Sequence, residues 1–184
     1  MLKKLVTAGV ILLTSSMSYA MCGAPYLAAS LGMKINTTSG GSASAGAPVN
    51  ARVANGLLAI GYGVTMLPCW YLGAEIFAAQ DAGIDNNDFG SSVMTSANYG
   101  ISVLPGFWFG DRTLGYVRLG AQRTQFSQVS AHSTGGQAGF GVQVNLMENW
   151  NMRVEYTYSA YGTVAGMTDT QSDQANIGIV YRFE

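Results

Sequence analysis

The sequence predicts an all-β chain in which eight antiparallel strands close into an up-and-down barrel that crosses a membrane. Three observations predict this fold. Only 10% of the 184 residues are charged, whereas 48% are hydrophobic, and an average soluble domain is about 25% charged. Apolar residues alternate with small or polar ones in eight successive segments, which is the pattern of strands with two different faces. The connections between these segments are alternately long and short.

The composition excludes several other classes of protein. The formal net charge of −1 leaves no basic patch for nucleic acid. A chain this apolar with so little net charge does not match the composition of disordered proteins. A membrane-spanning helix needs about 20 consecutive apolar residues, and beyond the N-terminal segment Gly, Ser, Asn or Thr interrupts every apolar run. We therefore expect strands, not helices, to cross the membrane.

The N-terminal segment, residues 1–20, reads as a cleaved signal peptide. Lys3 and Lys4 form a positive start, an apolar stretch follows, and Ser18-Tyr19-Ala20 resembles the small-x-small cleavage signal. Met21 precedes Cys22, where a lipoprotein signal would place a small residue. We expect a barrel domain over residues 21–184 and no further periplasmic domain.

The first four strands are expected over 26–35, 53–66, 70–79 and 97–109. In chain order, their apolar faces carry Leu27, Leu31 and Ile35; Leu58, Ile60 and Val64; Leu72 and Ile76; and Tyr99, Ile101 and Val103. The opposite faces carry Ser30 and Lys34; Gly61 and Gly63; Gly73 and Glu75; and Asn98 and Ser102.

The last four strands are expected over 114–125, 138–146, 150–160 and 174–183. Their apolar faces carry Val117 and Leu119; Phe140, Val142 and Leu146; Met152, Val154 and Tyr156; and Ile177, Ile179 and Phe183. The opposite faces carry Tyr116, Arg118 and Gln122; Gly141, Gln143 and Asn145; Arg153, Glu155 and Thr157; and Asn176, Gly178 and Arg182.

The nature of the two faces decides the kind of barrel. Eight strands leave an interior just wide enough for side chains, and the small polar residues fit that space. The larger apolar faces then point outward toward lipid, which is the outer-membrane pattern. Four long loops (36–52, 80–96, 126–137, 161–173) alternate with three short turns (67–69, 110–113, 147–149). In such barrels the long loops are extracellular and the short turns periplasmic.

The three tryptophans, Trp70, Trp108 and Trp150, all flank the short turns. Because indole prefers the membrane–water interface, we expect them to form the periplasmic interface girdle. Aromatic residues near the long loops would form the other girdle: Tyr99, Phe126, Phe140 and Tyr158.

Four charged residues, Glu75, Arg118, Arg153 and Glu155, face inward by parity and lie near the short turns. Arg or Lys on the lipid face costs about 2–4 kcal/mol at mid-depth. We therefore predict a lumen ion-pair and hydrogen-bond network. A plug that satisfies polar groups is the favoured interpretation, and a gate or proton path is the alternative. Arg123 points outward near a long loop, where it can snorkel to headgroups.

The chain resembles small outer-membrane β-barrels, the OmpA/OmpX-type transmembrane domains and opacity-like surface proteins, over residues 24–184. The carriers are Tyr71-Leu72-Gly73-Ala74-Glu75, Tyr116-Val117-Arg118-Leu119-Gly120, Arg153-Val154-Glu155-Tyr156 and the last strand. That strand fits the family's assembly signal at Asn176, Gly178, Tyr181 and Phe183, although Glu184 follows the final aromatic residue. The resemblance implies periplasmic chaperones, the barrel assembly machinery, outer-membrane lipid and lipopolysaccharide as partners. It also implies that Glu75 and Arg118 match the family's interior ion pairs.

Other candidate sites are weaker. Cys22 and Cys69 both lie at the periplasmic end, where either a disulfide between them or free thiols remain open. His132 lies in a predicted loop beside Ser130 and Ser133, without the scaffold and third residue that a hydrolase needs. The loop aspartates, Asp81, Asp85 and Asp88, do not match an EF-hand loop, and we expect them to lie in a solvated acidic loop. We expect no catalytic residue, no cofactor and no metal.

The sequence therefore predicts a Gram-negative outer-membrane barrel with a structural or surface-interaction role in envelope integrity, adhesion or host contact. The extracellular loops would carry this role toward a host or cell-surface ligand. A narrow pore and, more remotely, a lipid-A-modifying barrel enzyme are the alternatives.

Overall fold

The computed structural model describes residues 22–38, 49–66, 69–82, 95–126, 132–161 and 170–183. The expected signal peptide lies outside these residues. The eight strands are β1 (Cys22–Thr38), β2 (Val49–Met66), β3 (Trp70–Ala82), β4 (Thr95–Phe109), β5 (Thr113–Phe126), β6 (His132–Asn145), β7 (Trp150–Tyr161) and β8 (Thr170–Arg182).

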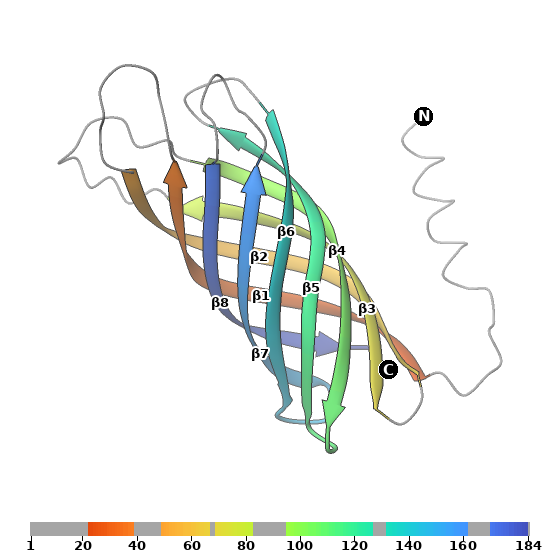
Figure 1. The fold of residues 1–184 in the computed structure, drawn as a ribbon. Helices are drawn as coiled ribbons and strands as arrows, with labels where there is room; N and C mark the ends of the chain where they lie inside the picture. Colours follow the sequence, from red (N-terminus) through yellow and green to blue (C-terminus); the bar gives the residue numbers. More distant parts are fainter. Residues whose placement is uncertain are drawn as a thin grey trace, which may run out of the picture.

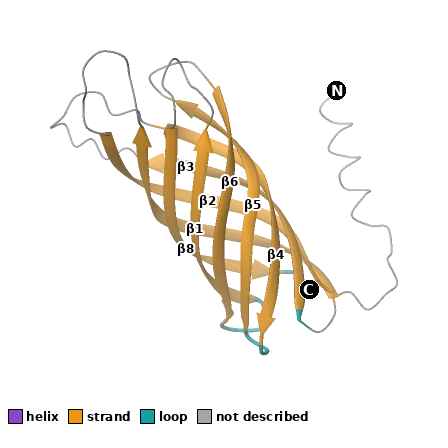
Figure 2. Cartoon of the chain, viewed as in Figure 1, coloured by secondary structure: helices purple, strands orange, loops and turns teal. Residues whose placement is uncertain are grey.

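The strands form one closed barrel in the order β1 to β8 (Figure 1). Each strand pairs antiparallel with the next, and β8 pairs antiparallel with β1. Between them, the described residues form strands and short loops (Figure 2). None of the described segments is a helix long and apolar enough to cross a membrane. The predicted eight-stranded barrel is confirmed.

The pairing register shifts by ten residues in one circuit of the barrel. The row of paired residues that starts at Ala28 returns to β1 at Thr38, after passing through Ala59, Phe77, Gly100, Gln122, Gly135, Tyr161 and Thr170. Such a stagger requires strands that tilt relative to the barrel axis, and the tilt is visible in Figure 1. The interior of an eight-stranded barrel is narrow enough for side chains to fill it.

Side chains alternate between lumen and exterior along every strand. The alternation is unbroken in β7, from exposed Trp150 to buried Tyr161. The large apolar side chains on the exterior face are exposed; the exposed fraction is 72% for Leu31 and 69% for Ile76. Because a soluble protein would bury this continuous apolar belt, the exterior matches a lipid-facing wall.

Several strands are longer than the sequence pattern indicated, mostly at the end that carries the long connections, although β1 also begins earlier at the other end, at Cys22 and not at 26. β6 begins at His132, not at 138, and β8 begins at Thr170, not at 174. The residues at these ends are small and polar on both faces, so their hydrophobic contrast is too weak to reveal a strand, although the backbone ladder continues. The end with the long connections is called the outer end below, and the end with the short turns the inner end.

Two predictions fail for this reason. His132 and Ser133 are not loop residues but the first residues of β6, and Ser133 is buried. Asp81 is not in a solvated loop but in β3, with an almost fully buried side chain. Asp85 and Asp88 lie outside the described residues.

Candidate functional site: the lumen and the outer wall

The four predicted lumen charges come together from three strands. Glu75 lies on β3, Arg118 on β5, and Arg153 and Glu155 on β7. Each is at most 5% exposed, because alternate residues of a strand point to the same face and these four lie on the face that points into the closed interior.

Glu75 is the centre of this network, which we call the charge cluster. One of its carboxylate oxygens accepts a hydrogen bond from Arg118 Nη2 and the other from Arg153 Nη1. Arg118 also reaches the second carboxylate, with its Nε 2.9 Å from Glu155 Oε1. Two arginines and two glutamates therefore balance within one buried group.

Two tyrosines complete the charge cluster, and each donates a hydrogen bond to one of the two glutamates. The Tyr26 hydroxyl donates to Glu75 Oε1 at 3.0 Å. The Tyr116 hydroxyl donates to Glu155 Oε2 at 2.6 Å. The Arg153 guanidinium lies 5.6 Å from the ring centroid of Tyr26 and 5.3 Å from that of Tyr116, within the range of a cation–π interaction.

A glycine lies beneath each tyrosine. Tyr26 of β1 pairs with Gly61 of β2, and Gly61 pairs with Glu75 of β3. Tyr116 pairs with Gly141, which pairs with Glu155. A Cβ at Gly61 or Gly141 would lie 2.3 Å or 2.4 Å from the tyrosine ring. Each glycine therefore lets a tyrosine cross one strand and reach the glutamate beyond it.

The sequence pattern does not identify these tyrosines as members of the charge cluster. Parity alone places Tyr26 and Tyr116 inside, but only the pairing register shows that each shares a row with a glycine and a glutamate. The register was not readable from one sequence.

A second ion pair lies nearer the outer end. Lys34 Nζ is 3.2 Å from Asp81 Oδ2, and the two side chains are 1% and 2% exposed. β2 lies between their strands. The inward direction of Lys34 follows the parity expected for it, whereas the sequence pattern did not identify Asp81 as its partner.

The sequence predicts that Trp108 belongs to the aromatic girdle on the exterior of the inner end, but the structure places it elsewhere. It is half-buried and packs against an apolar group inside the inner end of the lumen, made of Tyr71, Leu104, Leu114 and Tyr116. Its ring meets Tyr71 edge-on at 6.4 Å and lies 6.0 Å from the Arg182 guanidinium. Closeness to a turn does not decide which way a side chain points, whereas the parity of β4 directs even-numbered residues such as Ser102 and Leu104 inward.

The aromatic residues on the exterior wall at the inner end are therefore a different set from the predicted one. Trp70 and Trp150 are 58% and 46% exposed, as a girdle requires, and their ring contacts are to Phe107 and Tyr181 respectively. Phe107 and Phe109 take the outward positions on either side of Trp108. Toward the outer end, Tyr99 and Tyr158 point outward, whereas the side chain of Phe126 lies outside the description. Phe140 also points outward, but it lies near the middle of β6, since this strand begins at His132.

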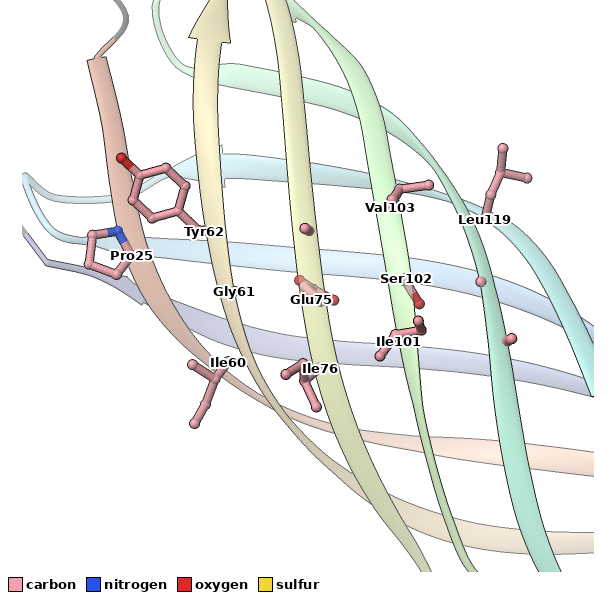
Figure 3. Close-up of a pocket in the computed structure, with 13 residues that line it drawn as sticks. Pro25, Ile60, Gly61, Tyr62, Glu75, Ile76, Ile101, Ser102, Val103 and Leu119 are labelled. Atoms are coloured by element: carbon pink, nitrogen blue, oxygen red, sulfur yellow. The ribbon is translucent and has the colours of Figure 1, made fainter. Parts of the chain in front are cut away.

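The lipid-facing wall is hollowed over β2 to β5. Figure 3 shows Ile60, Ile76, Val103 and Leu119 projecting outward, whereas Glu75 and Ser102 lie on the lumen side of the same strands. The groove between the projecting side chains has a volume of about 620 Å³. Its walls are apolar, as expected for a surface in contact with acyl chains. Arg123 is exposed on this wall of β5, opposite Tyr99 of β4.

The remaining predicted residues are placed as follows. On β8, Asn176 faces the lumen, Gly178 pairs with Arg153, and Tyr181 and Phe183 stack edge-on with centroids 4.9 Å apart. Cys69 is half-buried with a free thiol. The side chain of Cys22 lies outside the description, so nothing described joins the two cysteines. Within the described residues, no group of three or more His, Cys, Asp or Glu is placed to hold a metal ion.

The comparison with protein families accords with this geometry. The model of the outer membrane protein β-barrel domain matches residues 7–183. The chain belongs to this family. It is accordingly a β-barrel protein of the Gram-negative outer membrane. No match is found among curated proteins.

Solved barrels of this family type have the same fold at low sequence identity. Neisserial surface protein A is 16% identical with a TM-score of 0.58, over 86% of this chain and 97% of that one. The attachment invasion locus protein Ail of Yersinia pestis, solved with the heparin analogue sucrose octasulfate, is 20% identical with a TM-score of 0.51. That match covers 86% of this chain and 99% of Ail.

Proposed function

We propose that this outer-membrane barrel has a closed lumen and acts at the cell surface, in envelope integrity, adhesion or host contact, through its outer-end connections. The observation that carries the proposal is the charge cluster. Four charged side chains, each at most 5% exposed, meet across the lumen from β3, β5 and β7.

The cluster supports closure for two reasons. Its carboxylates accept hydrogen bonds from arginine and tyrosine on several sides, so an ion that entered would have to displace a partner. Removing one partner of a buried pair leaves an uncompensated charge, which costs about 3–5 kcal/mol. With lipid around the wall and the lumen filled, the outer end is the surface at which the protein can meet partners.

The resemblance to attachment proteins supports adhesion among these roles. Ail was solved with a heparin analogue, and we infer a host or cell-surface ligand for this chain as well. Lipopolysaccharide would surround the outer end. The barrel assembly machinery and periplasmic chaperones would deliver the chain, after removal of residues 1–20.

Deletion of the outer-end connections one at a time tests this role. Replacing 39–48, 83–94, 127–131 or 162–169 by a short Gly-Ser linker is expected to abolish binding to cells in at least one case. Each variant should still show the heat-modifiable gel mobility of a folded barrel. Asp111→Ser in an inner-end turn is the matched control and should bind normally. Unchanged binding and unchanged envelope permeability in all four variants would contradict the proposal.

A narrow pore is the second candidate, because polar side chains line the lumen on both sides of the charge cluster. Steady ion conductance by the reconstituted wild-type barrel would favour the pore over the surface role. We propose no catalytic role, since Glu75 and Glu155 are both held by arginines and tyrosines and neither is free to act as a base. A mass change in lipopolysaccharide after incubation with the pure protein would contradict this.

A further inference from the structure

The outer end of the lumen contains buried polar atoms that the protein does not pair. Within the described residues, Asn36 Nδ2, Asn55 Nδ2 and Oδ1, Asn98 Oδ1 and Ser172 Oγ have no hydrogen-bond partner. The four residues are 7%, 4%, 3% and 1% exposed. Buried polar groups in native proteins are almost always hydrogen-bonded, so these atoms require partners beyond the described residues.

The four residues form two groups on one part of the wall. Asn36 and Ser172 are cross-strand partners on β1 and β8. Asn55 of β2 pairs with Asp81 of β3. Asn98 of β4 pairs with Ala79, two residues from Asp81 on the same face, and such diagonal neighbours are about 7–8 Å apart. The two groups are offset along the strands, because Asn55 pairs with Gly32 of β1, four residues from Asn36. The four residues come from β8, β1, β2 and β4, with Asp81 of β3 between Asn55 and Asn98, and we call them the amide ring.

The charge at this level is already balanced. Lys34 and Asp81 lie among the ring residues and pair with each other at 3.2 Å. The ring itself offers only amides and a hydroxyl, which are neutral. A ligand that carries a net charge would therefore lack a counter-charge here.

We infer that the amide ring binds uncharged hydroxyl groups. A hydroxyl both donates and accepts, so it matches a set in which Asn36 and Asn55 offer N–H groups while Asn55 and Asn98 offer carbonyl oxygens. Two sources carry this chemistry: water, or the hydroxyls of a neutral saccharide that enters from the outer end. The saccharide source rests on the proposed surface function, and the water source does not.

The lumen side formed by β5 and β6 contains amides that are paired. Gln122 of β5 donates to the Tyr161 hydroxyl at 2.6 Å, and Gln137 of β6 donates to Ser102 at 2.6 Å. Amides of the same chemistry are satisfied there within the chain. The difference makes Gln122 a matched control for the ring.

Whether Ser172→Ala lowers or raises the stability of the barrel tests whether a hydroxyl group is bound to the amide ring. Ser172→Ala removes one hydroxyl with little change of shape. If a bound hydroxyl partners Ser172 Oγ, the midpoint of urea unfolding in lipid vesicles should fall. If the atom has no partner, the substitution removes a buried polar group at no loss and the midpoint should stay the same or rise, which would overturn the inference. Ser102→Ala, which loses bonds from Arg118 and Gln137, should lower the midpoint in either case and shows that the assay responds.

Nuclear magnetic resonance distinguishes the two sources. In the full barrel in bicelles, cross-peaks from the side-chain amides of Asn36 and Asn55 to long-lived water would identify water. Shifts of these amides on titration with sucrose would identify a saccharide. In that case Asn55→Ala should weaken sucrose binding at least tenfold, Gln122→Ala should leave it unchanged, and sucrose octasulfate should not compete.

Absence of both water cross-peaks and sucrose shifts would overturn the inference. The ring residues belong to strands, so they persist when the outer-end connections are deleted. Failure of the surface-binding experiment would therefore leave the water result intact, and the two proposals can fail independently.

Discussion

Glu75 illustrates how one residue can determine the closure of the lumen. It is 2% exposed and accepts hydrogen bonds from Arg118, Arg153 and Tyr26. Burial of a carboxylate is costly, and pairing offsets that cost only while every partner is present. The stability of the cluster therefore depends on charge balance more than on any single contact.

Replacing the central carboxylate should destabilise the barrel. Glu75→Gln leaves Arg118 and Arg153 with Glu155 as the one remaining carboxylate of the charge cluster, and we expect a loss of about 3–5 kcal/mol in the free energy of unfolding. Tyr26→Phe removes a hydrogen bond to a charged acceptor and should cost about 1.5–3 kcal/mol. Urea titration in lipid vesicles measures both. An effect of Glu75→Gln smaller than that of Tyr26→Phe would contradict this description of the cluster.

The opposite orientations of the tryptophans can be measured directly. Trp70 and Trp150 point into lipid, whereas Trp108 lies against Tyr71 inside the inner end. In variants that retain a single tryptophan, lipids brominated on their acyl chains should quench Trp70 and Trp150 strongly and Trp108 weakly. Equal quenching of all three would place Trp108 on the outer wall after all.

At the scale of the strands, the two Tyr–Gly–Glu rows link local composition to the lumen. Each glycine leaves a gap in the wall, and a tyrosine from the neighbouring strand fills it. Glycine in the interior of a strand weakens it unless something must approach closely. Here the close approach carries a hydroxyl to a buried carboxylate, so the weak positions of β2 and β6 are compensated by the charge cluster.

Two glycines of β6 give a matched test of this arrangement. A Cβ at Gly141 would lie 2.4 Å from Tyr116 Oη, whereas nothing lies within 4 Å of one at Gly136. Gly141→Ala should cost about 1–3 kcal/mol of stability through overpacking, and Gly136→Ala should be near neutral or slightly stabilising. Chemical denaturation compares the two. Equal costs would show that the glycine beneath Tyr116 is not required.

The last strand is expected to matter during assembly more than in the folded state. Tyr181 and Phe183 lie on the outer wall beside Trp150, where loss of one ring is tolerable. We predict that Phe183→Ala reduces the amount of heat-modifiable barrel in cells several-fold, while the purified variant refolds in vesicles. Normal cellular amounts would contradict a role for this strand in recognition by the assembly machinery.

Much of the strand architecture could be predicted because alternation is a local signal. Every face assignment from Tyr26 to Phe183 agrees with the burial of the described residues. The outer ends could not be predicted, because residues such as Ser133 and Asp81 lie where both faces are polar. The parity of β4 indicates the inward orientation of Trp108, whereas its closeness to a turn does not decide the direction of the side chain.

At the scale of the whole molecule, the barrel is closed in layers that no local pattern reveals. The amide ring and the Lys34–Asp81 pair lie toward the outer end, the charge cluster follows, and Tyr71, Leu104, Leu114 and Trp108 fill the inner end. The inward direction of each residue follows from parity. Their grouping into layers depends on the ten-residue stagger of the closed sheet, which sets which strands bring residues to one height.

This layering predicts that closure does not depend on the charge cluster alone. Glu75→Gln should not open a lasting pore while the inner-end aromatic and aliphatic side chains remain in place. Glu75→Gln combined with Trp108→Ala should conduct more than either single variant. Conductance by Glu75→Gln equal to that of the double variant would assign closure to the cluster by itself.

Single-channel recording of the wild-type barrel in planar bilayers tests the central claim most directly. A barrel whose lumen is closed by the charge cluster and the inner-end side chains should show a silent baseline under an applied voltage, in preparations that gel mobility shows to be folded. Reproducible conductance steps that disappear when a bulky side chain is introduced in the lumen, as in Ser102→Trp, would show that ions pass through the barrel and would contradict the account.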